Sequence, residues 1–245
     1  MRRLLILTMA ASFLAYLPCA FGQTETLYLD DPPSNNSWDG IYTGAYSFTN
    51  SATGANQQMI CDDFADEQTY APTTFTVSSF GNWTNTMYGN LSNATQLYEE
   101  AAYLAITGVL ATTGVTQSYY NFALWAVFQP SNVLSYLTSL GDNGACNAVF
   151  GSNCSSVNLS HVGGFLGTAQ QNYNNGSVNY SSVTILTPVG CAHSDGGNCN
   201  SGANFGQEFL LVPEGGAAAA YLLLAGASCL GAIFLRRQGR FADRT

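Results

Sequence analysis

The sequence predicts an α+β fold in which antiparallel strands flank a central helical segment. Residues that alternate between apolar and polar occur on both sides of a stretch whose apolar residues recur every three or four positions. This order of strands, helices and strands is typical of α+β domains. About 190 residues separate the two terminal segments, which fits a single domain.

The expected strands are rich in β-branched and aromatic residues with a period of two. A polar, proline-rich lead-in over 23–40 precedes the first of them, and the last two follow the helices. The predicted strands cover 41–49, 57–64, 73–83, 183–186 and 205–212.

The central segment is predicted to be helical from its spacing. Apolar residues from Leu97 to Ala105 line one face of the first helix. The second helix is strongly aromatic and ends before Pro130, which cannot continue it. Gly163 and Gly164 weaken the last. The four expected helices cover 95–111, 116–128, 132–140 and 159–173.

The first 22 residues are typical of a signal peptide. Arg2 and Arg3 precede an apolar run, and small residues at Ala20 and Gly22 suit cleavage by signal peptidase. The mature chain is then expected to begin near residue 23, with an extracytoplasmic domain over 23–211.

The segment 212–245 has three parts. Val212-Pro213-Glu214 comes first, an uncharged stretch over 215–235 follows, and Arg236-Arg237 opens a basic tail over 236–245. As a helix the stretch rises about 31 Å, enough to cross a hydrocarbon core. The positive-inside rule places the tail in the cytoplasm.

This order resembles the PEP-CTERM sorting signal of Gram-negative bacteria. The resemblance implies an inner-membrane precursor, recognition by an exosortase-type transpeptidase, removal of the tail, and delivery to the cell surface or an exopolysaccharide matrix. The chain departs from the family's Pro-Glu-Pro because Gly215 follows Glu214. A plain tail-anchoring helix is the alternative interpretation.

The charge distribution limits the class of ligand. The six basic side chains are all arginines in the two terminal segments, whereas fourteen of the fifteen acidic residues lie between Glu25 and Glu214. Nucleic acids and anionic headgroups require a basic face, so the domain is not expected to bind them.

The expected export places the cysteines of the domain in an oxidising compartment, where disulfides form. Cys146–Cys154 and Cys191–Cys199 have the same spacing in loop-rich sequence, so the simplest pairing makes two local disulfides, with crossed pairing left open. Cys61 is then the odd cysteine. The domain contains Cys61, Cys146, Cys154, Cys191 and Cys199.

A second resemblance involves Cys61. The run Cys61-Asp62-Asp63-Phe64 in a strand, followed by a helix with Tyr120-Asn121-Phe122-Ala123-Leu124-Trp125, resembles the thioester (TQxA) adhesin domains. In that family the cysteine and a glutamine condense into a thioester that bonds covalently to amines. Asn121, one methylene shorter, occupies the glutamine position, and Gln117 one turn earlier is a second candidate carboxamide.

Other chemistry has weaker signals. His161 or His193 would be the base of an envelope cysteine hydrolase that uses Cys61. The acidic runs 62–67 and 195–198 lack the spacing of a dedicated calcium loop. No phosphate loop, zinc signature or Ser-His-Asp pattern is present, and we expect no metal and no cofactor.

The sequence therefore predicts a non-enzymatic, exosortase-sorted surface or matrix protein with a role in adhesion, biofilm or exopolysaccharide organisation. Its ligand is not named by any motif. The alternatives are a covalent thioester adhesin using Cys61 and an envelope cysteine hydrolase.

Overall fold

The computed structural model describes part of the chain and divides it into two compact units, Met1–Leu211 and Val212–Thr245. Everything below concerns the first unit. The expected signal peptide, apart from its last two residues, and the segment after Val212 lie outside the described residues. Those described are 21–31, 37–64, 70–151, 163–176, 178–194, 199 and 206–212.

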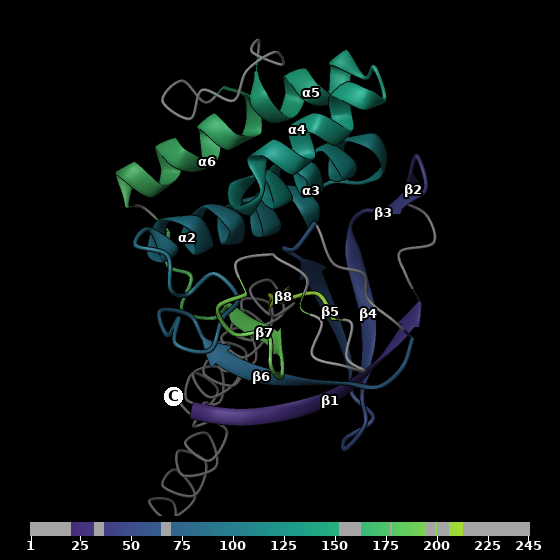
Figure 1. Cartoon of the computed structure of the whole chain (residues 1–245), viewed down its shortest axis with the longest axis vertical. Coiled ribbons are helices and arrows are strands. Elements are labelled where there is room, and N and C mark those ends of the chain that lie inside the picture. The colour runs from purple at the N-terminus through teal and green to yellow at the C-terminus, as the bar shows by residue number, and fades with distance from the viewer. Residues whose placement is uncertain are drawn as a thin grey trace, which may run out of the picture. The chain divides into compact units, whose positions relative to one another are not determined.

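Six antiparallel strands close into a barrel with the order β1-β4-β5-β8-β7-β6 (Figure 1). A separate hairpin, β2–β3, connects β1 to β4. The strands are β1 (Phe21–Asp31), β2 (Ser37–Trp38), β3 (Ile41–Tyr42), β4 (Ala45–Asn50), β5 (Asn56–Cys61), β6 (Thr73–Ser79), β7 (Thr184–Pro188) and β8 (Phe209–Leu211).

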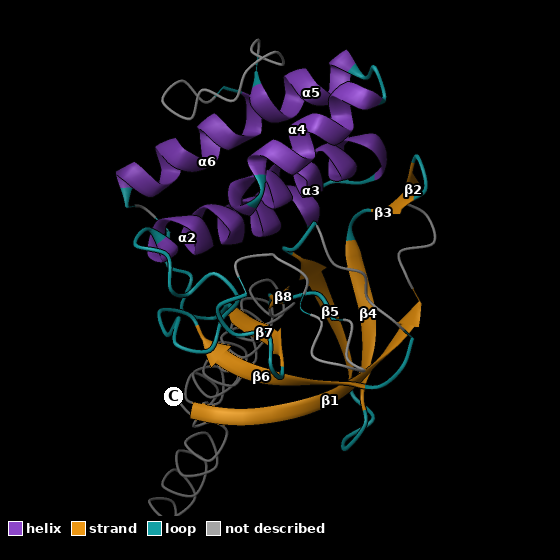
Figure 2. Ribbon diagram, in the orientation of Figure 1, coloured by secondary structure: helices purple, strands orange, loops and turns teal. Residues whose placement is uncertain are grey.

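The helices form one continuous insertion between β6 and β7, and they gather on one side of the barrel (Figure 2). This mixture of helices and strands agrees with the predicted α+β class. The helical elements are α2 (Ala94–Leu104), the π-helical turn η1 (Ala105–Val109), α3 (Gly114–Phe128), α4 (Pro130–Ser139), α5 (Asn143–Phe150) and α6 (Gly164–Asn175).

A cluster of phenylalanines fills the barrel. Phe48, Phe75 and Phe209 come from β4, β6 and β8, and none of them is exposed to solvent. Their ring centroids lie 5.0 Å apart for Phe48–Phe209, 6.0 Å for Phe75–Phe209 and 6.3 Å for Phe48–Phe75, all in edge-to-face geometry. The cluster thus joins two strands that precede the helical insertion to one that follows it.

The lead-in predicted over 23–40 is wrong in its first part, because residues 21–31 form the longest strand of the barrel. Leu27 and Leu29 are buried and Tyr28 between them is exposed, which is the alternation of a strand with one solvent face. Strand β1 pairs with both β4 and β6 and so closes the barrel.

The loop predicted between Cys146 and Cys154 is also wrong in part, because α5 extends to Phe150. Asp142 caps this helix: its Oδ1 accepts a hydrogen bond of 2.9 Å from the Ala145 backbone N–H. Ala145 and Val149, one turn apart, are both fully buried. Local capping and burial outweigh the loop-like composition.

Glycines permit close helix contacts. A Cβ at Gly108 in η1 would lie 2.0 Å from Cδ1 of Tyr120 on α3, so only glycine lets the two elements approach. Gly164 opens α6 with a φ of +61°, and its Cβ would lie 2.3 Å from the Ala148 carbonyl oxygen. The glycines that weakened the prediction of 159–173 are required by packing.

In the part of the chain that the structure describes, no helix combines the length and the apolar character needed to cross a membrane. The expected span over 215–235 lies outside that part.

Phe209→Ala is expected to lower the free energy of unfolding by about 3–5 kcal/mol, because it removes a fully buried ring that contacts three other rings. Urea unfolding followed by tryptophan fluorescence measures the loss. Tyr28→Ala, at a position that is 43% exposed, is the control and should cost less than about 1 kcal/mol. Equal losses in the two variants would contradict the barrel core described above.

Candidate functional site

Cys61 is the last residue of β5 and is completely buried. Its thiol donates a hydrogen bond of 2.9 Å to the Asp63 carbonyl oxygen, and its own carbonyl oxygen accepts one of 3.0 Å from Nε1 of Trp125. The cysteine is a free thiol. The strand residue and the aromatic helix of the sequence pattern are therefore in direct contact.

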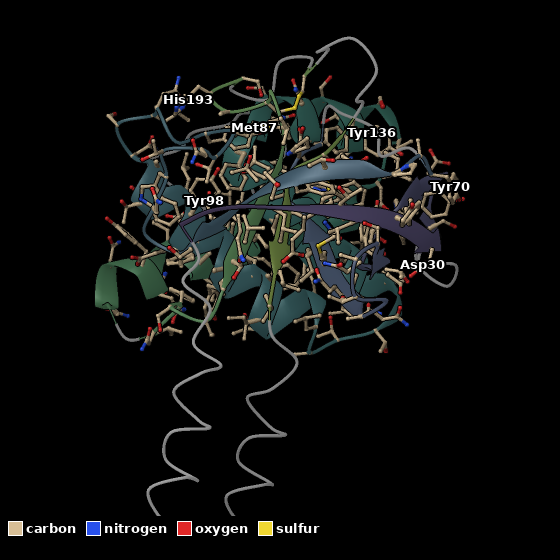
Figure 3. All side chains as sticks on the ribbon, turned by 90° about the horizontal axis from the view of Figure 1, so that it is seen from below. Asp30, Tyr70, Met87, Tyr98, Tyr136 and His193 are labelled. Atoms are coloured by element: carbon tan, nitrogen blue, oxygen red, sulfur yellow. A yellow bond between two sulfur atoms is a disulfide. The ribbon has the colours of Figure 1, made fainter. Side chains whose placement is uncertain are left out.

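The environment of Cys61 opposes nucleophilic chemistry. Burial raises the pKa of the thiol well above its usual value, and the charges of Asp63 and Asp62 raise it further. A neutral thiol is neither a good nucleophile nor a metal ligand. His193 is exposed at the periphery of the unit (Figure 3), and His161 lies outside the described residues. The structure pairs the thiol with a carbonyl group and not with an imidazole.

The two candidate carboxamides have partners of their own. Asn121 is fully buried and its Oδ1 accepts a hydrogen bond of 2.6 Å from the Gly44 backbone N–H. Nε2 of Gln117 donates one of 2.5 Å to the Val109 carbonyl oxygen. Asn121 thus fastens α3 to the corner before β4, and Gln117 fastens α3 to η1.

One face of α3 carries three such attachments. Ser118, Asn121 and Trp125 bond to Thr43, Gly44 and Cys61, the first of these through a 2.7 Å contact between hydroxyl oxygens. The spacing of three and then four residues places all three side chains on one side of the helix. The face that resembles a thioester motif therefore positions the helical layer on the barrel.

Glu208, immediately before β8, is the centre of a buried polar network and is completely inaccessible to solvent. Its carboxylate accepts hydrogen bonds from the Met87 backbone N–H at 2.7 Å, from the Tyr98 hydroxyl at 2.5 Å and from the Thr187 hydroxyl. Met87 and Tyr98 are labelled in Figure 3. The donors come from the loop before α2, from α2 and from β7.

Asp62 faces this network. It is fully buried, and no N–H or O–H donor of the described residues reaches either of its carboxyl oxygens. Burial raises its pKa well above the usual value, and the charges of Glu208 and Asp63 and its hydrogen bond with Glu208 act in the same direction. Burial also raises the pKa of Glu208, whereas its donors lower it. Burial and the neighbouring charges thus favour the protonated form of Asp62 beside the Glu208 carboxylate.

Asp63 extends the network to the end of α3. Its Oδ1 accepts a 2.8 Å hydrogen bond from Nε2 of Gln129, which also donates to the Tyr88 hydroxyl at 2.8 Å. The Asp63 carbonyl oxygen accepts from Cys61 and from Nε2 of Gln207. Cys61 and Glu208 thus belong to one continuous set of buried polar groups.

Among the described residues, no group of three or more His, Cys, Asp or Glu side chains has an arrangement that could hold a metal ion. Of the acidic run 62–67, Asp62 and Asp63 are buried in the network, and residues 65–67 lie outside the described part, as does 195–198.

This chain matches no family model, no curated protein and no solved structure.

Some of the remaining predicted residues lie within the described part of the chain and others lie outside it. Cys191 and Cys199 lie at disulfide distance, with their Cα atoms 5.3 Å apart. Cys146 is buried on α5, and its expected partner Cys154 lies outside the described residues. So do four residues of the expected sorting motif, Pro213, Glu214, Arg236 and Arg237.

Sequence reasoning missed most of the buried network. Glu208 had a usable signal, since a lone charged residue beside the apolar run of a predicted strand must be paired if it is buried. No sequence signal marks the other members of the network, because their role depends on contacts with residues distant in the chain. These members are Thr187, Tyr98 and Gln129.

Asp62→Asn is expected to reduce the pH dependence of stability. A raised pKa in the folded state means that the folded protein binds more protons than the unfolded chain, so stability falls as the pH rises above about 4, where unfolded Asp62 ionises. Asparagine has nearly the same size as aspartic acid but cannot ionise. Urea midpoints between pH 4 and pH 8 should therefore fall less steeply in the variant.

The matched control is Asp30→Asn, which removes a carboxylate whose hydrogen bond to Thr49 is exposed to solvent. Its midpoints should follow the parent protein at every pH. If the urea midpoint of Asp62→Asn fell with pH as steeply as that of the parent, the raised pKa of Asp62 would be contradicted.

Proposed function

We propose that this chain is an exported, non-enzymatic surface or matrix protein, sorted by its C-terminal segment, that takes part in adhesion, biofilm or exopolysaccharide organisation. The observation that carries the proposal is the order of Val212-Pro213-Glu214, an uncharged span and Arg236-Arg237, which resembles a PEP-CTERM signal. The signal-peptide pattern at residues 1–22 supports export.

The position of the fold along the chain is compatible with this proposal. The last barrel strand, β8, ends at Leu211, immediately before Val212. Removal of the chain from Pro213 onward would therefore leave all six barrel strands intact.

The chemistry of the Cys61 region supports a structural role. Its thiol is buried and neutral, its neighbouring carboxamides bond to backbone groups, and its carboxylates are used in the Glu208 network. Cys61, Asp62, Asp63 and Asn121 are also completely buried, so they are not exposed to a substrate in this structure. A non-enzymatic cargo fits this arrangement better than a hydrolase does.

Replacement of Val212-Pro213-Glu214 by three alanines is expected to hold the precursor in the inner membrane with its C-terminal segment attached. Exchange of both Arg236 and Arg237 for alanine should have the same effect. Fractionation of the natural host, with mass spectrometry of the C-terminal peptide, measures both outcomes.

Arg244→Ala is the control, because it removes a charge from the same tail and leaves the Arg pair in place. It should sort as the parent does. If both test variants sorted normally, the C-terminal segment would be only a membrane anchor, and the proposal would be overturned.

Cys61 is expected to remain a free thiol that alkylating reagents reach only after unfolding. The intact mass of the purified chain should be unchanged by methylamine, since Asn121 and Cys61 each bond to other groups. Mass spectrometry before and after the amine tests this. A native mass lower by one ammonia, restored by methylamine and insensitive to it in Cys61→Ala, would instead establish the thioester.

A further inference from the structure

A hollow of about 390 Å³ opens on the surface between the β2–β3 hairpin and the turn from α4 to α5. Its volume falls within the range of small-molecule pockets, roughly 300–1,000 Å³. We call it the hairpin groove. It is lined by Ser37, Trp38, Asp39, Leu140 and Asp142.

The hairpin holds its aromatic side chain in a fixed position. Asp39 and Gly40 form the turn with φ values of +47° and +85°, the left-handed pair that a two-residue hairpin of matching twist requires. Trp38 precedes the turn, and its ring packs against Tyr119 of α3 at a centroid distance of 5.4 Å and an interplanar angle of 68°. The indole is thus half-buried on a helix and partly open to the groove.

The opposite wall is equally fixed. Asp142 caps α5 through its Oδ1, so the helix holds the carboxylate in place. Leu140 beside it contributes an apolar surface. The groove therefore combines one indole, one leucine, one hydroxyl group and two carboxylates. The β2–β3 hairpin and the start of α5 hold these groups in place.

The electrostatics of the groove limit the occupant. Asp39 and Asp142 make it negative, and residues 4–235 contain no lysine or arginine to balance them. Anionic ligands are repelled by two carboxylates at short range. Carboxylates are strong acceptors for hydroxyl donors, and an aromatic ring offers an apolar face beside them. Sugar rings present that combination, with a C–H face on one side and hydroxyl groups at the rim.

A cationic ammonium ligand would also be attracted by the carboxylates. Strong cation–π sites surround the cation with several ring faces. Among the described residues, Trp38 is the one aromatic residue that lines the groove, and Tyr119 is in edge-to-face contact with it. A single indole ring therefore favours the C–H face of a sugar ring over an ammonium group.

We propose that the hairpin groove binds uncharged glycan chains, with Trp38 under the C–H face of a sugar ring and Asp39 and Asp142 accepting hydrogen bonds from its hydroxyl groups. The proposal rests on the proposed function and makes it specific: the matrix component held by this protein is a neutral polysaccharide.

Calorimetric titration of the full chain in detergent micelles tests the groove. The neutral probes are hexasaccharides of glucose, mannose, galactose and N-acetylglucosamine. The charged probes are an alginate hexamer and a glucosamine hexamer. At least one neutral probe should bind, and Trp38→Ala should weaken it at least about tenfold, the size of one lost aromatic anchor.

The double variant Asp39→Asn and Asp142→Asn separates charge from folding. Asparagine tolerates the left-handed turn and caps a helix as well as aspartate does. A weakening of about tenfold for the best neutral probe is expected from the lost charge-assisted hydrogen bonds. Tyr28→Ala removes an exposed aromatic side chain outside the groove and should bind as the parent does.

Three results would overturn the proposal: no binding of any neutral probe, binding of the glucosamine hexamer alone, or equal losses in Trp38→Ala and Tyr28→Ala. A chain that sorts normally to the matrix yet binds no neutral probe would overturn the groove and leave the proposed function standing. A chain that never leaves the inner membrane would overturn the proposed function itself.

Discussion

The buried carboxylate of Glu208 is the constraint on which the rest of the fold depends. A charge without solvent contact costs several kcal/mol unless it is fully hydrogen-bonded, and this chain has no lysine or arginine near it in sequence. Its donors must therefore come from β7, from α2 and from the loop that carries Met87. These elements lie on both sides of the helical insertion, so one side chain requires the barrel and the helices to form together.

Helix α3 plays the complementary part. Its polar face bonds to the ends of β3 to β5 through Ser118, Asn121 and Trp125, while its other side meets α2, α5 and α6. Residues that resemble a reactive motif in the sequence therefore connect the helical layer to the barrel. The open groove is elsewhere, at the β2–β3 hairpin, where Trp38 and Asp142 are ordered by internal contacts and still line the surface. The residues that stabilise the fold and the residues of the proposed binding groove thus lie in different parts of the domain.

The sequence was sufficient for the elements whose signals are local. Periodicity identified α2, α3 and the strands that contain Phe48 and Phe75. It failed for β1, where Glu25 lies on the strand face of the buried Leu27 and Leu29 and the prolines after Asp31 suggested a loop, and for α5, whose glycine and asparagine content hid a capped helix. Closure of the barrel and the partners of Glu208 were not predictable, because they depend on pairings across more than a hundred residues, as in Met87–Glu208.

The barrel is discontinuous in sequence: β7 and β8 follow the whole helical insertion. A chain that emerges from its N-terminus thus presents β5 and β6 with unpaired edges until the last residues of the domain arrive, and open strand edges favour pairing between chains. If the chain is exported as proposed, the precursor needs protection from self-association during this interval. That interval ends only when β8, the strand immediately before Val212, pairs with β5 and β7.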